Sequence, residues 1–358
     1  MAVTKTGRTG AGRTTRAKAK TAQTNGNGEV VVRRGAKAAR AGLDARSFAE
    51  RFDSVVANIE RVIKGKNEVI RMALVALVAD GHVLFEDMPG TGKTMLARAI
   101  GQTVSADWSR IQCTPDLLPA DVTGSPVLDR NTGDFVFRHG PVFANVFLAD
   151  ELNRATPKTQ ASLLEAMGER RVTYDGVEYP LPQPFFVLAT MNPIEQAGTF
   201  PLPEAQLDRF LFKLSMGYTN REAEVEVLKA NQRREAINRL DASLELDELV
   251  EMMDWALEVE VSDPILYYIT DIVQATRTDP ALSMGASSRA SQALMRASRV
   301  MAASQGRDDV LPEDVKRLVP PVLAHRLMLT PDAQLRDETI DNVIDRILHR
   351  VKVSMGAA

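Results

Sequence analysis

The stretch Asp87-Met88-Pro89-Gly90-Thr91-Gly92-Lys93-Thr94 decides the fold of this 358-residue chain. It follows a short apolar run, His82–Glu86, which predicts a buried strand, and it leads into Thr94–Val104, whose apolar spacing predicts a helix. A glycine-rich loop between strand and helix that ends in Gly-Lys-Thr is close to the phosphate-binding pattern G-x-x-x-x-G-K-[ST]. The stretch departs from that pattern at its first position, where Asp87 replaces glycine. We therefore expect a nucleotide phosphate to bind here.

Each residue type in this loop suits a phosphate. Gly90 and Gly92 allow the backbone to curl so that N–H groups point at phosphate oxygens, and the following helix directs its positive end toward the same anion. Lys93 can reach the β- and γ-phosphates, and the Thr94 hydroxyl can bind Mg²⁺. The Asp87 carboxylate has to point away from the phosphates. The predicted ATP-binding residues of the loop are Pro89, Gly90, Thr91, Gly92, Lys93, Thr94 and Met95.

A second apolar run, Asn145–Ala149, ends in the acidic pair Asp150 and Glu151. Mg²⁺ prefers hard oxygen ligands, which predicts that Asp150 binds the metal or its water shell. Glu151 is expected to orient or deprotonate the attacking water. The alternative is a strand end whose acids cap the next helix, and it is less favoured after a buried strand and a phosphate loop.

Two further candidates follow later apolar runs. Asn192 is placed to hold the attacking water or the γ-phosphate, although an Asn-Pro pair also forms turns. Arg209 is a candidate for supplying positive charge to the reaction, and its alternative is a surface ion pair.

Short apolar runs alternate with helical stretches up to Tyr218, and then the strand pattern stops. The richest runs are continuous, which is typical of parallel strands buried on both faces, and the β-α-β order predicts helices on both sides of the sheet. We expect an α/β fold, with a parallel five-stranded sheet in residues 47–218 and an all-α domain in residues 219–358. The predicted strands are His82–Glu86, Ser109–Cys113, Asn145–Ala149, Phe185–Thr190 and Phe210–Ser215.

The formal charge of −3 divides unevenly along the chain. Residues 1–46 hold 11 Lys and Arg against two acids, a charge of +9, and the other 312 residues hold 33 basic and 45 acidic side chains, a charge of −12. Residues 1–28 carry almost no large apolar side chain, which predicts a disordered basic tail. Such a tail can bind nucleic acid only nonspecifically, and a merely solvated tail is the favoured alternative.

Composition excludes several classes of protein. With 44% hydrophobic and 25% charged residues, the chain is not collagen-like, mucin-like or wholly disordered. Its longest apolar stretches, such as Met72–Ala79, are too short for a membrane span, which takes about 20 residues. The single cysteine, Cys113, excludes an intrachain disulfide and fits a cytoplasmic location.

The motifs above lie within a longer resemblance to the MoxR family of AAA+ ATPases, covering residues 62–299. It rests on the stretches VLFEDMPGTGKT, TPDLLPADVTGS, FVFRHGPVFANVFLADELNRATPKTQASLLEAMGERRVTYDG, FFVLATMNPIEQAGTFPLPEAQLDRF and GASSRASQALMRASR. The resemblance implies an AAA+ nucleotide-binding core followed by a helical lid domain. It also implies ATP and Mg²⁺ as cofactors.

The resemblance assigns roles to the phosphate-site residues. Lys93 and Thr94 resemble the Walker A pair. Asp150 and Glu151 resemble the Walker B pair, with Glu151 as the catalytic carboxylate. Asn192 matches the residue called sensor 1.

The same resemblance assigns residues outside the phosphate loop. Arg209 matches the arginine finger that acts on the ATP of the neighbouring subunit, and Arg289 matches sensor 2, on a lid helix facing the γ-phosphate. Ile63 and Gly65 resemble the adenine-side segment. Here the chain reads Ile63-Lys64-Gly65-Lys66, where relatives often read I-V-G-Q.

Two insertions also match the family. Gly124–Arg138 resembles the helix-2 insert, and Arg170–Leu181, with the turn Asp175-Gly176, resembles the presensor-1 hairpin. In this clade both hairpins point toward the central opening of a ring or toward partners, and their alternative is a pair of plain surface hairpins.

The function implied by the resemblance is that of a ring-forming ATPase, a homo-oligomer with six subunits. It would remodel, assemble or mature a protein client, in the manner of a chaperone, often with a partner that carries a von Willebrand factor A domain. Two alternatives remain open at this point: an ATP-driven nucleic-acid motor or regulator, and an ATPase subunit of a chelatase.

Overall fold

The computed structural model describes residues 43–88, 90–192, 198–232 and 240–353. Contacts within the chain separate residues 1–42 from a compact unit, residues 43–358, and the described residues all belong to that unit. The predicted basic tail therefore lies outside the described residues, apart from its last four. Helix α1, Ala45–Glu60, begins within those four, where the Asp44 carboxylate accepts the N–H of Ser47 at 2.7 Å and caps the helix.

A five-stranded sheet with the order β2-β5-β8-β1-β9 forms the centre of the fold. Its strands are β1 (Val83–Glu86), β2 (Trp108–Gln112), β5 (Val146–Asp150), β8 (Phe186–Met191) and β9 (Phe212–Leu214). Every neighbouring pair is parallel, so the predicted fold class is confirmed. The inner strands β5, β8 and β1 are almost wholly buried, which explains why they appear in the sequence as continuous apolar runs.

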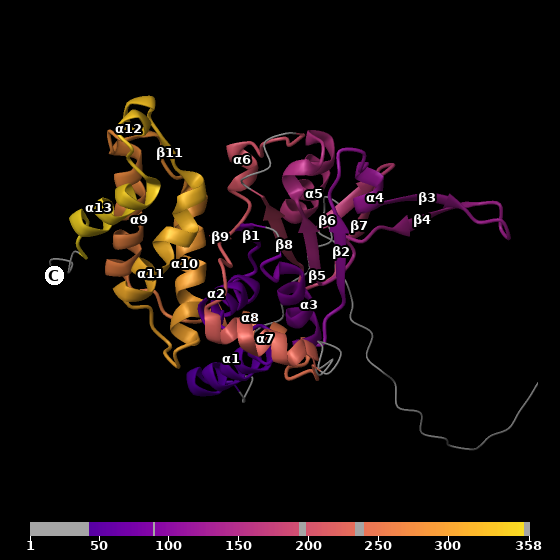
Figure 1. The fold of residues 1–358 in the computed structure, drawn as a ribbon, viewed down its shortest axis with the longest axis horizontal. Coiled ribbons are helices and arrows are strands. Elements are labelled where there is room, and N and C mark those ends of the chain that lie inside the picture. Colours follow the sequence, from indigo (N-terminus) through magenta and orange to yellow (C-terminus); the bar gives the residue numbers. More distant parts are fainter. Residues whose placement is uncertain (1–42, 89, 193–197, 233–239, 354–358) are drawn as a thin grey trace, which may run out of the picture. The chain divides into compact units, whose positions relative to one another are not determined.

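Helices cover both faces of this sheet (Figure 1). Alternate residues of β1 point to opposite faces: Val83 and Phe85 belong to one apolar core, and Leu84 belongs to the other. The helices that pack in the first core include α1, α2 (Asn67–Val78) and α3 (Lys93–Thr103). The second core is shared with α4 (Pro119–Thr123) and α5 (Pro157–Glu169). The strands are thus held from both sides, and their ends have fixed positions.

The carboxyl ends of the parallel strands meet at one edge of the sheet. In the strand register Glu86 lies opposite Met191, and Gln112 lies opposite Asp150. Ligands of open α/β sheets bind at this edge, because strand-to-helix loops and strand-end side chains converge there. The phosphate loop follows β1 and the acidic pair closes β5, so the fold brings both motifs to the same place.

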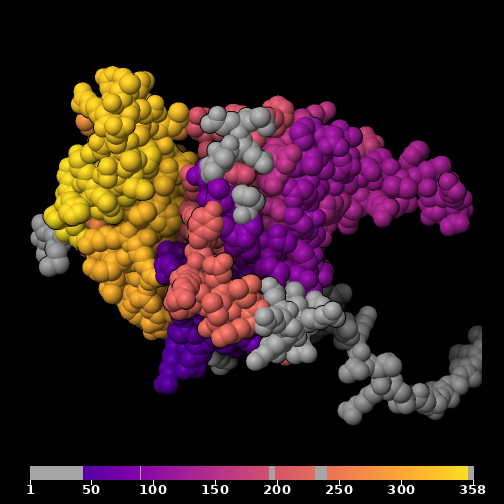
Figure 2. All heavy atoms as spheres, viewed as in Figure 1, coloured from indigo at the N-terminus to yellow at the C-terminus, as the bar shows by residue number. Residues whose placement is uncertain are grey.

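Two antiparallel hairpins leave the core. One pairs β3 (Gly124–Leu128) with β4 (Phe135–His139), and the other pairs β6 (Arg171–Tyr174) with β7 (Val177–Pro180). The β3–β4 hairpin projects away from the sheet (Figure 1), and its tip stands clear of the neighbouring surface in the space-filling view (Figure 2).

An aromatic cluster joins the two hairpins where they leave the core. The Phe137 ring of β4 stacks on the Tyr179 ring of β7, with 4.2 Å between centroids, and lies 5.4 Å from the Tyr174 ring of β6. His139 stacks on Phe143 at 4.0 Å. Aromatic contacts of this kind contribute about 0.5–1.5 kcal/mol beyond the burial of their area. The two hairpins therefore pack against each other as well as against the core.

The second half of the chain is helical, with one correction to the prediction. Its helices are α7 (Arg221–Gln232), α8 (Leu246–Ala256), α9 (Asp263–Thr278), α10 (Ser288–Ala303), α11 (Pro312–Leu323), α12 (Pro331–Leu335) and α13 (Ile340–Arg350). The expectation that this half holds no strand is wrong, because β10 (Leu282–Met284) pairs with β11 (Met328–Leu329). These strands have three and two residues, too few to produce a recognisable alternation. No helix among the described residues is long and apolar enough to span a membrane.

Candidate functional site

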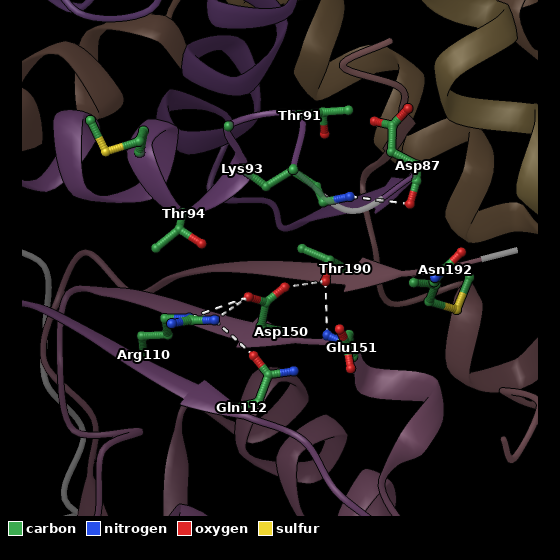
Figure 3. Close-up of a pocket in the computed structure, with 14 residues that line it drawn as sticks. Asp87, Thr91, Lys93, Thr94, Arg110, Gln112, Asp150, Glu151, Thr190 and Asn192 are labelled. Atoms are coloured by element: carbon green, nitrogen blue, oxygen red, sulfur yellow. Dashed lines mark hydrogen bonds and ion pairs between the residues drawn. The ribbon is translucent and has the colours of Figure 1, made fainter. Parts of the chain in front are cut away.

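A cavity of about 390 Å³ lies at the carboxyl edge of the sheet (Figure 3). We call it the phosphate hollow; it is lined by the loop after β1 and by the ends of β2, β5 and β8. The predicted site residues that line it are Gly90, Thr91, Gly92, Lys93, Thr94, Met95, Asp150, Glu151 and Asn192. Pro89, also predicted, lies outside the described residues. The fold thus brings three separate stretches of sequence together at one site.

The glycines of the loop are required by backbone conformation. Gly90 has φ = +83° and Gly92 has φ = +95°, angles that side-chain-bearing residues rarely adopt. A Cβ atom at Gly90 would meet nothing within 4 Å, and one at Gly92 only the Met216 side chain at 3.9 Å. Space is therefore available, and the curled backbone is what selects glycine. Helix α3 starts directly after Gly92 with no side-chain cap, so its N-terminal end suits an anion.

The ammonium group of Lys93 is held by the first residues of the loop. Its Nζ donates to the backbone oxygens of Met88 at 2.9 Å and Asp87 at 3.2 Å. Burial lowers the pKa of Lys93, and the carboxylates of Asp87, Asp150 and Glu151 oppose that shift. The ammonium group is thus a cation in a small cavity that also holds carboxylates, which is an arrangement suited to a metal-bound polyphosphate.

Asp87, the departure from the loop pattern, has a structural role. Its carboxylate accepts hydrogen bonds from the Ser215 hydroxyl at 2.7 Å, from the Gly217 N–H at 3.1 Å and from the Met216 N–H. The side chain is 8% exposed. As expected, the charge is used away from the phosphates, and it ties the start of the loop to the segment after β9 that leads into the helical half.

Asp150 and Glu151 are connected through Thr190, the neighbouring residue on β8. The Thr190 hydroxyl donates to Asp150 Oδ1 at 2.6 Å and accepts the backbone N–H of Glu151 at 2.8 Å (Figure 3). Arg110 of β2 donates to the other carboxylate oxygen, Oδ2, at 2.7 Å, and to Gln112 Oε1 at 2.7 Å. Both oxygens of Asp150 are therefore oriented by residues on neighbouring strands.

The backbone of Glu151 is in the left-handed region, with φ = +56°. A non-glycine residue in a sparsely populated conformation costs about 1–3 kcal/mol and is characteristic of functional sites. The Glu151 Oε2 atom accepts from Arg154 Nη1 at 2.8 Å. The turn after β5 thus directs Glu151 into the hollow, at a position suited to activating a water molecule.

The residues present fit Mg²⁺ bound together with a nucleotide. Thr94 and Asp150, which line the same hollow, offer a hydroxyl and a carboxylate, and Mg²⁺ is usually bound by one or two such oxygens plus phosphates and water. Among the described residues there is no group of three or more His, Cys, Asp and Glu that could hold a metal. The donor set therefore suits a metal that arrives with phosphate oxygens.

Asn192 lies at the end of β8 and is 9% exposed. Its backbone oxygen accepts from the Asn153 side chain at 3.3 Å, which ties the strand end to the turn after the acidic pair. The Asn192 side chain is one of the groups lining the hollow.

The structure separates the two predicted arginines from the phosphate hollow. Arg209 and Arg289 both line a second cavity, of about 450 Å³. Arg209 Nη1 donates to the backbone oxygen of Leu164, and a Cβ at Gly168 would lie 2.5 Å from that nitrogen. The guanidinium therefore lies directly against α5, beside a position that has no side chain.

Ile63 and Gly65 are not among the residues lining the phosphate hollow. Gly65, with φ = +69°, packs closely on Ala223 of α7, where an added Cβ would lie 2.8 Å from the Ala223 Cβ. The neighbouring Lys66, which departs from the family pattern, donates to the backbone oxygens of Tyr218 at 2.7 Å and Gly217 at 3.1 Å. The segment therefore contacts the entry to the helical half, and Lys66 has a structural partner there.

Four residues of the phosphate hollow were not predicted from the sequence: Arg110, Gln112, Thr190 and Met191. Thr190 and Met191 lie at the end of a run already predicted as a strand, immediately before Asn192. A polar residue at the end of an apolar run was the available signal for Thr190. Arg110 and Gln112 lie on an edge strand, and the sequence alone does not show that β2 lies next to β5.

The glycine loop, its lysine and the strand-end carboxylates on a parallel sheet define a P-loop ATPase. The sequence profile of the ATPase family associated with various cellular activities (AAA) matches residues 82–212, and the AAA lid domain profile matches residues 274–347. The chain is therefore an AAA ATPase, which binds and hydrolyses ATP.

More closely similar proteins identify the family. The chain is 40% identical to the chaperone MoxR1 of Mycobacterium tuberculosis, over 84% of this chain and 81% of that protein. It is 32% identical to the MoxR protein of Methylorubrum extorquens, over 82% and 91%. A crystal structure of a Cytophaga hutchinsonii protein superposes with a TM-score of 0.82 at 35% identity, covering 87% of this chain and 97% of that one. The chain belongs to the MoxR family of AAA ATPases.

Proposed function

We propose that this ATPase works as a homo-oligomeric ring, with six subunits, in which each ATP is hydrolysed at the boundary between two subunits. The observation that carries the proposal is the position of Arg209 and Arg289. Both cations lie in a cavity apart from the phosphate hollow of their own chain. A charge-supplying arginine in that position can serve a nucleotide only if another subunit presents it.

Within one subunit the proposed division of work follows the contacts described above. Residues 90–95 and the start of α3 bind the phosphates, with Lys93 neutralising the β- and γ-phosphates. Asp150 and Thr94 would hold Mg²⁺, which supplies positive charge to the phosphate oxygens when bound. Glu151 removes a proton from the attacking water, and Asn192 orients that water or the γ-phosphate.

The proposed roles of the remaining regions follow from the resemblance to MoxR-family ATPases. Residues 47–218 form the nucleotide-binding domain and residues 219–358 the lid domain. Ile63 and Gly65, in the turn between α1 and α2, lie on the adenine side. We place the protein in the cytoplasm, which fits a chain with a single cysteine.

The proposed output is the remodelling, assembly or maturation of a protein client, with a von Willebrand factor A domain protein as the class of partner. Support comes from the family, one of whose members is described as a chaperone. It also comes from the β3–β4 hairpin, whose tip exposes Leu128 and Phe135, the latter 74% exposed. A projecting apolar tip is a suitable contact for a polypeptide.

Mixed subunits test the ring. Arg209→Ala should lose turnover by about 10³–10⁵-fold, the usual range for an arginine finger, and Lys93→Ala should lose nucleotide binding. Mixing the two inactive variants creates boundaries in which an intact phosphate hollow meets an intact Arg209. We expect turnover to rise well above that of either variant alone, and the mass of the assembly to increase with ATP. Inactivity at every mixing ratio contradicts hydrolysis between subunits.

A nucleic-acid role is favoured by one observation, the charge of +9 in residues 1–46. Deleting residues 1–42 leaves helix α1 and its Asp44 cap intact. We expect DNA to have no effect on ATP hydrolysis by this shortened chain. Stimulation by DNA after that deletion would instead support a nucleic-acid motor.

A further inference from the structure

The second cavity, which we call the arginine hollow, is lined by more positive charge than the two predicted arginines supply. It lies where the first turn after α2, the end of α5, the segment before β9 and one face of α10 meet. On α10 the lining residues are Arg289, Gln292, Ala293 and Arg296. Their spacing of three, four and seven places them on a single helix face. Arg296 therefore belongs to the same surface as Arg289, two turns further along.

Ion pairs neutralise only some of the arginines that line this hollow. Five arginines and three carboxylates line it. Arg170 pairs with Asp80 at 2.8 Å, and Arg326 pairs with Asp208 at 2.7 Å. The third carboxylate, Glu169, lies 3.4 Å from Arg171, outside the hollow.

Three guanidinium groups remain without a carboxylate partner among the described residues: Arg209, Arg289 and Arg296. Within the described ranges, the Arg209 guanidinium donates only to a backbone oxygen, that of Leu164. Arg296 is half-buried, and no hydrogen bond of its side chain is seen within the described part of the chain. Arg209 is half-buried as well, and Arg289 is exposed. Polar groups of a folded protein are normally paired when buried, and cations gathered without counter-charge are the arrangement that binds an anion.

The charge of Arg296 acts on its neighbours. Burial is the main cause that lowers the pKa of Arg170 and of Arg326, and the positive charge of Arg296 lowers both further. The same charge contributes to the low pKa of His82, after burial and Arg170. Arg296 is therefore directed toward the hollow, close to other cations, and an anion bound there would relieve this repulsion.

The spacing of the arginines indicates the kind of anion. Seven residues of helix separate Arg289 from Arg296, about 10 Å along the axis. That separation is too large for both to hold one phosphate group and suits an elongated anion with several charged groups. Guanidinium forks bind phosphate oxygens two at a time, so a chain of phosphates fits a row of three.

We propose that Arg296 binds the triphosphate of the nucleotide held by the neighbouring subunit, alongside Arg209 and Arg289. This inference rests on the proposed function, because it takes the arginine hollow as the surface that meets the phosphate hollow of the next subunit. Arg209 lies against α5, with a hydrogen bond to the Leu164 oxygen, on one wall of the hollow, and the two arginines of α10 lie on another. Arg296 would then anchor the phosphates furthest from Arg289.

Assembly with ATP tests the proposal without relying on turnover. In Glu151→Gln chains, which should retain ATP, we expect Arg296→Ala to raise the ATP concentration needed for half-maximal assembly by about 10–100-fold, the range for a hydrogen bond to a charged group. The ATP concentration needed by Arg296→Lys should lie between those of the parent chain and Arg296→Ala. Lysine keeps the positive charge and loses the two-pronged guanidinium geometry. Arg336→Ala removes an exposed arginine of α12's C-terminal end and should leave assembly unchanged. Sedimentation at several ATP concentrations measures all four proteins.

Mixed subunits then separate this inference from the proposed function. Arg296→Ala mixed with Lys93→Ala should hydrolyse ATP faster than the sum of the separate proteins, as should Arg209→Ala mixed with Lys93→Ala. If only the Arg209 mixture gains activity, the role of Arg296 is wrong and the ring stands. If neither mixture gains, the proposed function fails as well. An unchanged ATP requirement in Arg296→Ala also overturns the inference, and Arg296→Lys carries the test if the alanine variant unfolds.

Discussion

The phosphate hollow and the arginine hollow are of similar size, about 390 and 450 Å³, and they differ in how their charges are balanced. In the phosphate hollow the cation Lys93 faces Asp150 and Glu151, and each carboxylate has a partner. In the arginine hollow several guanidinium groups have no carboxylate partner among the described residues. The mixed charges of the phosphate hollow suit a nucleotide with its bound metal ion. The arginine hollow lacks such a counter-charge, and this difference is the basis of the proposal that the site is divided between two chains.

Within the phosphate hollow, the largest effect on kcat with ATP binding retained is expected from removing the base. Glu151→Gln keeps the size of the side chain and removes the carboxylate, so kcat should fall by about 10²–10⁴-fold. ATP binding should persist, because the loop and Asp150 are unchanged. Single-turnover hydrolysis and equilibrium binding of ATP measure the two quantities separately.

Glu165→Gln is the matched control, since Glu165 is exposed on helix α5 and lines neither hollow. Normal turnover in Glu151→Gln would show that Glu151 is not the catalytic base. It would also show that the phosphate hollow does not hold the base that the reaction needs.

A smaller effect is expected from Thr190→Val, which removes the hydroxyl joining Asp150 to the Glu151 N–H. The shape of the side chain is kept, and the half-buried Glu151 N–H loses its acceptor, which costs about 1–3 kcal/mol. We expect kcat to fall about 10-fold with little change in ATP affinity. Steady-state kinetics should show this split, and Thr270→Val, on exposed helix α9 surface, should behave as the unmodified chain. A loss of affinity equal to the loss of kcat would show that Thr190 supports binding instead of the geometry of the acidic pair.

Asp87→Asn weakens the tie between the loop and residues 215–217. The amide keeps one oxygen acceptor and loses the charge that three donors share, so we expect a loss of about 1–2 kcal/mol of unfolding free energy and a few-fold weaker ATP binding. Asp87→Gly restores the usual loop pattern and should be no better, because the tie is absent altogether. Urea unfolding and ATP titration measure both, with Asp129→Asn at the tip of β3 as control. Tighter ATP binding in Asp87→Gly would contradict the role given to Asp87.

The remaining expected effect is on the pH dependence of stability at His82, beside the arginine hollow. His82 is buried, its Nδ1 accepts the Val187 N–H at 3.1 Å, and burial lowers its pKa from 6.5 to about 3. The unfolded chain therefore binds one more proton than the folded chain between those values, so this stability is complete above pH 6.5 and is lost as the pH falls toward 3. The expected slope is about 1.4 kcal/mol per pH unit.

His82→Asn keeps an acceptor at the same place and should remove that slope, measured by urea unfolding at pH 7.5, 6 and 5. His349→Asn, at an exposed position, should leave it unchanged. A slope that survives in His82→Asn would assign the acid sensitivity to other groups, such as the buried His325, whose pKa is also lowered by burial.

The sheet and most of the phosphate hollow were predictable from the sequence. Continuous apolar runs marked the inner strands, and the loop and the acidic pair follow two of them directly. The roles of Arg110 and Thr190 were not predictable, because they depend on β2, β5 and β8 being neighbours, which local patterns do not determine.

The arginines also show that local sequence patterns do not determine which distant residues become neighbours. Arg209 and Arg289 are 80 residues apart in the sequence, and only the packing of α10 places them in one cavity. Asp87 could be recognised as a departure from the loop pattern. Its three donors lie about 130 residues away, so its purpose required the structure.

The aromatic cluster between the two hairpins has a consequence for any attempt to exchange parts between relatives. Phe137 and His139 belong to one hairpin, and Tyr174 and Tyr179 belong to the other. Deleting either hairpin would leave the rings of the other facing water, with the stability and solubility cost of a newly exposed apolar surface. The two inserts are therefore one transplantable module, and a chimaera that carries only one of them should be built with the partner rings replaced as well.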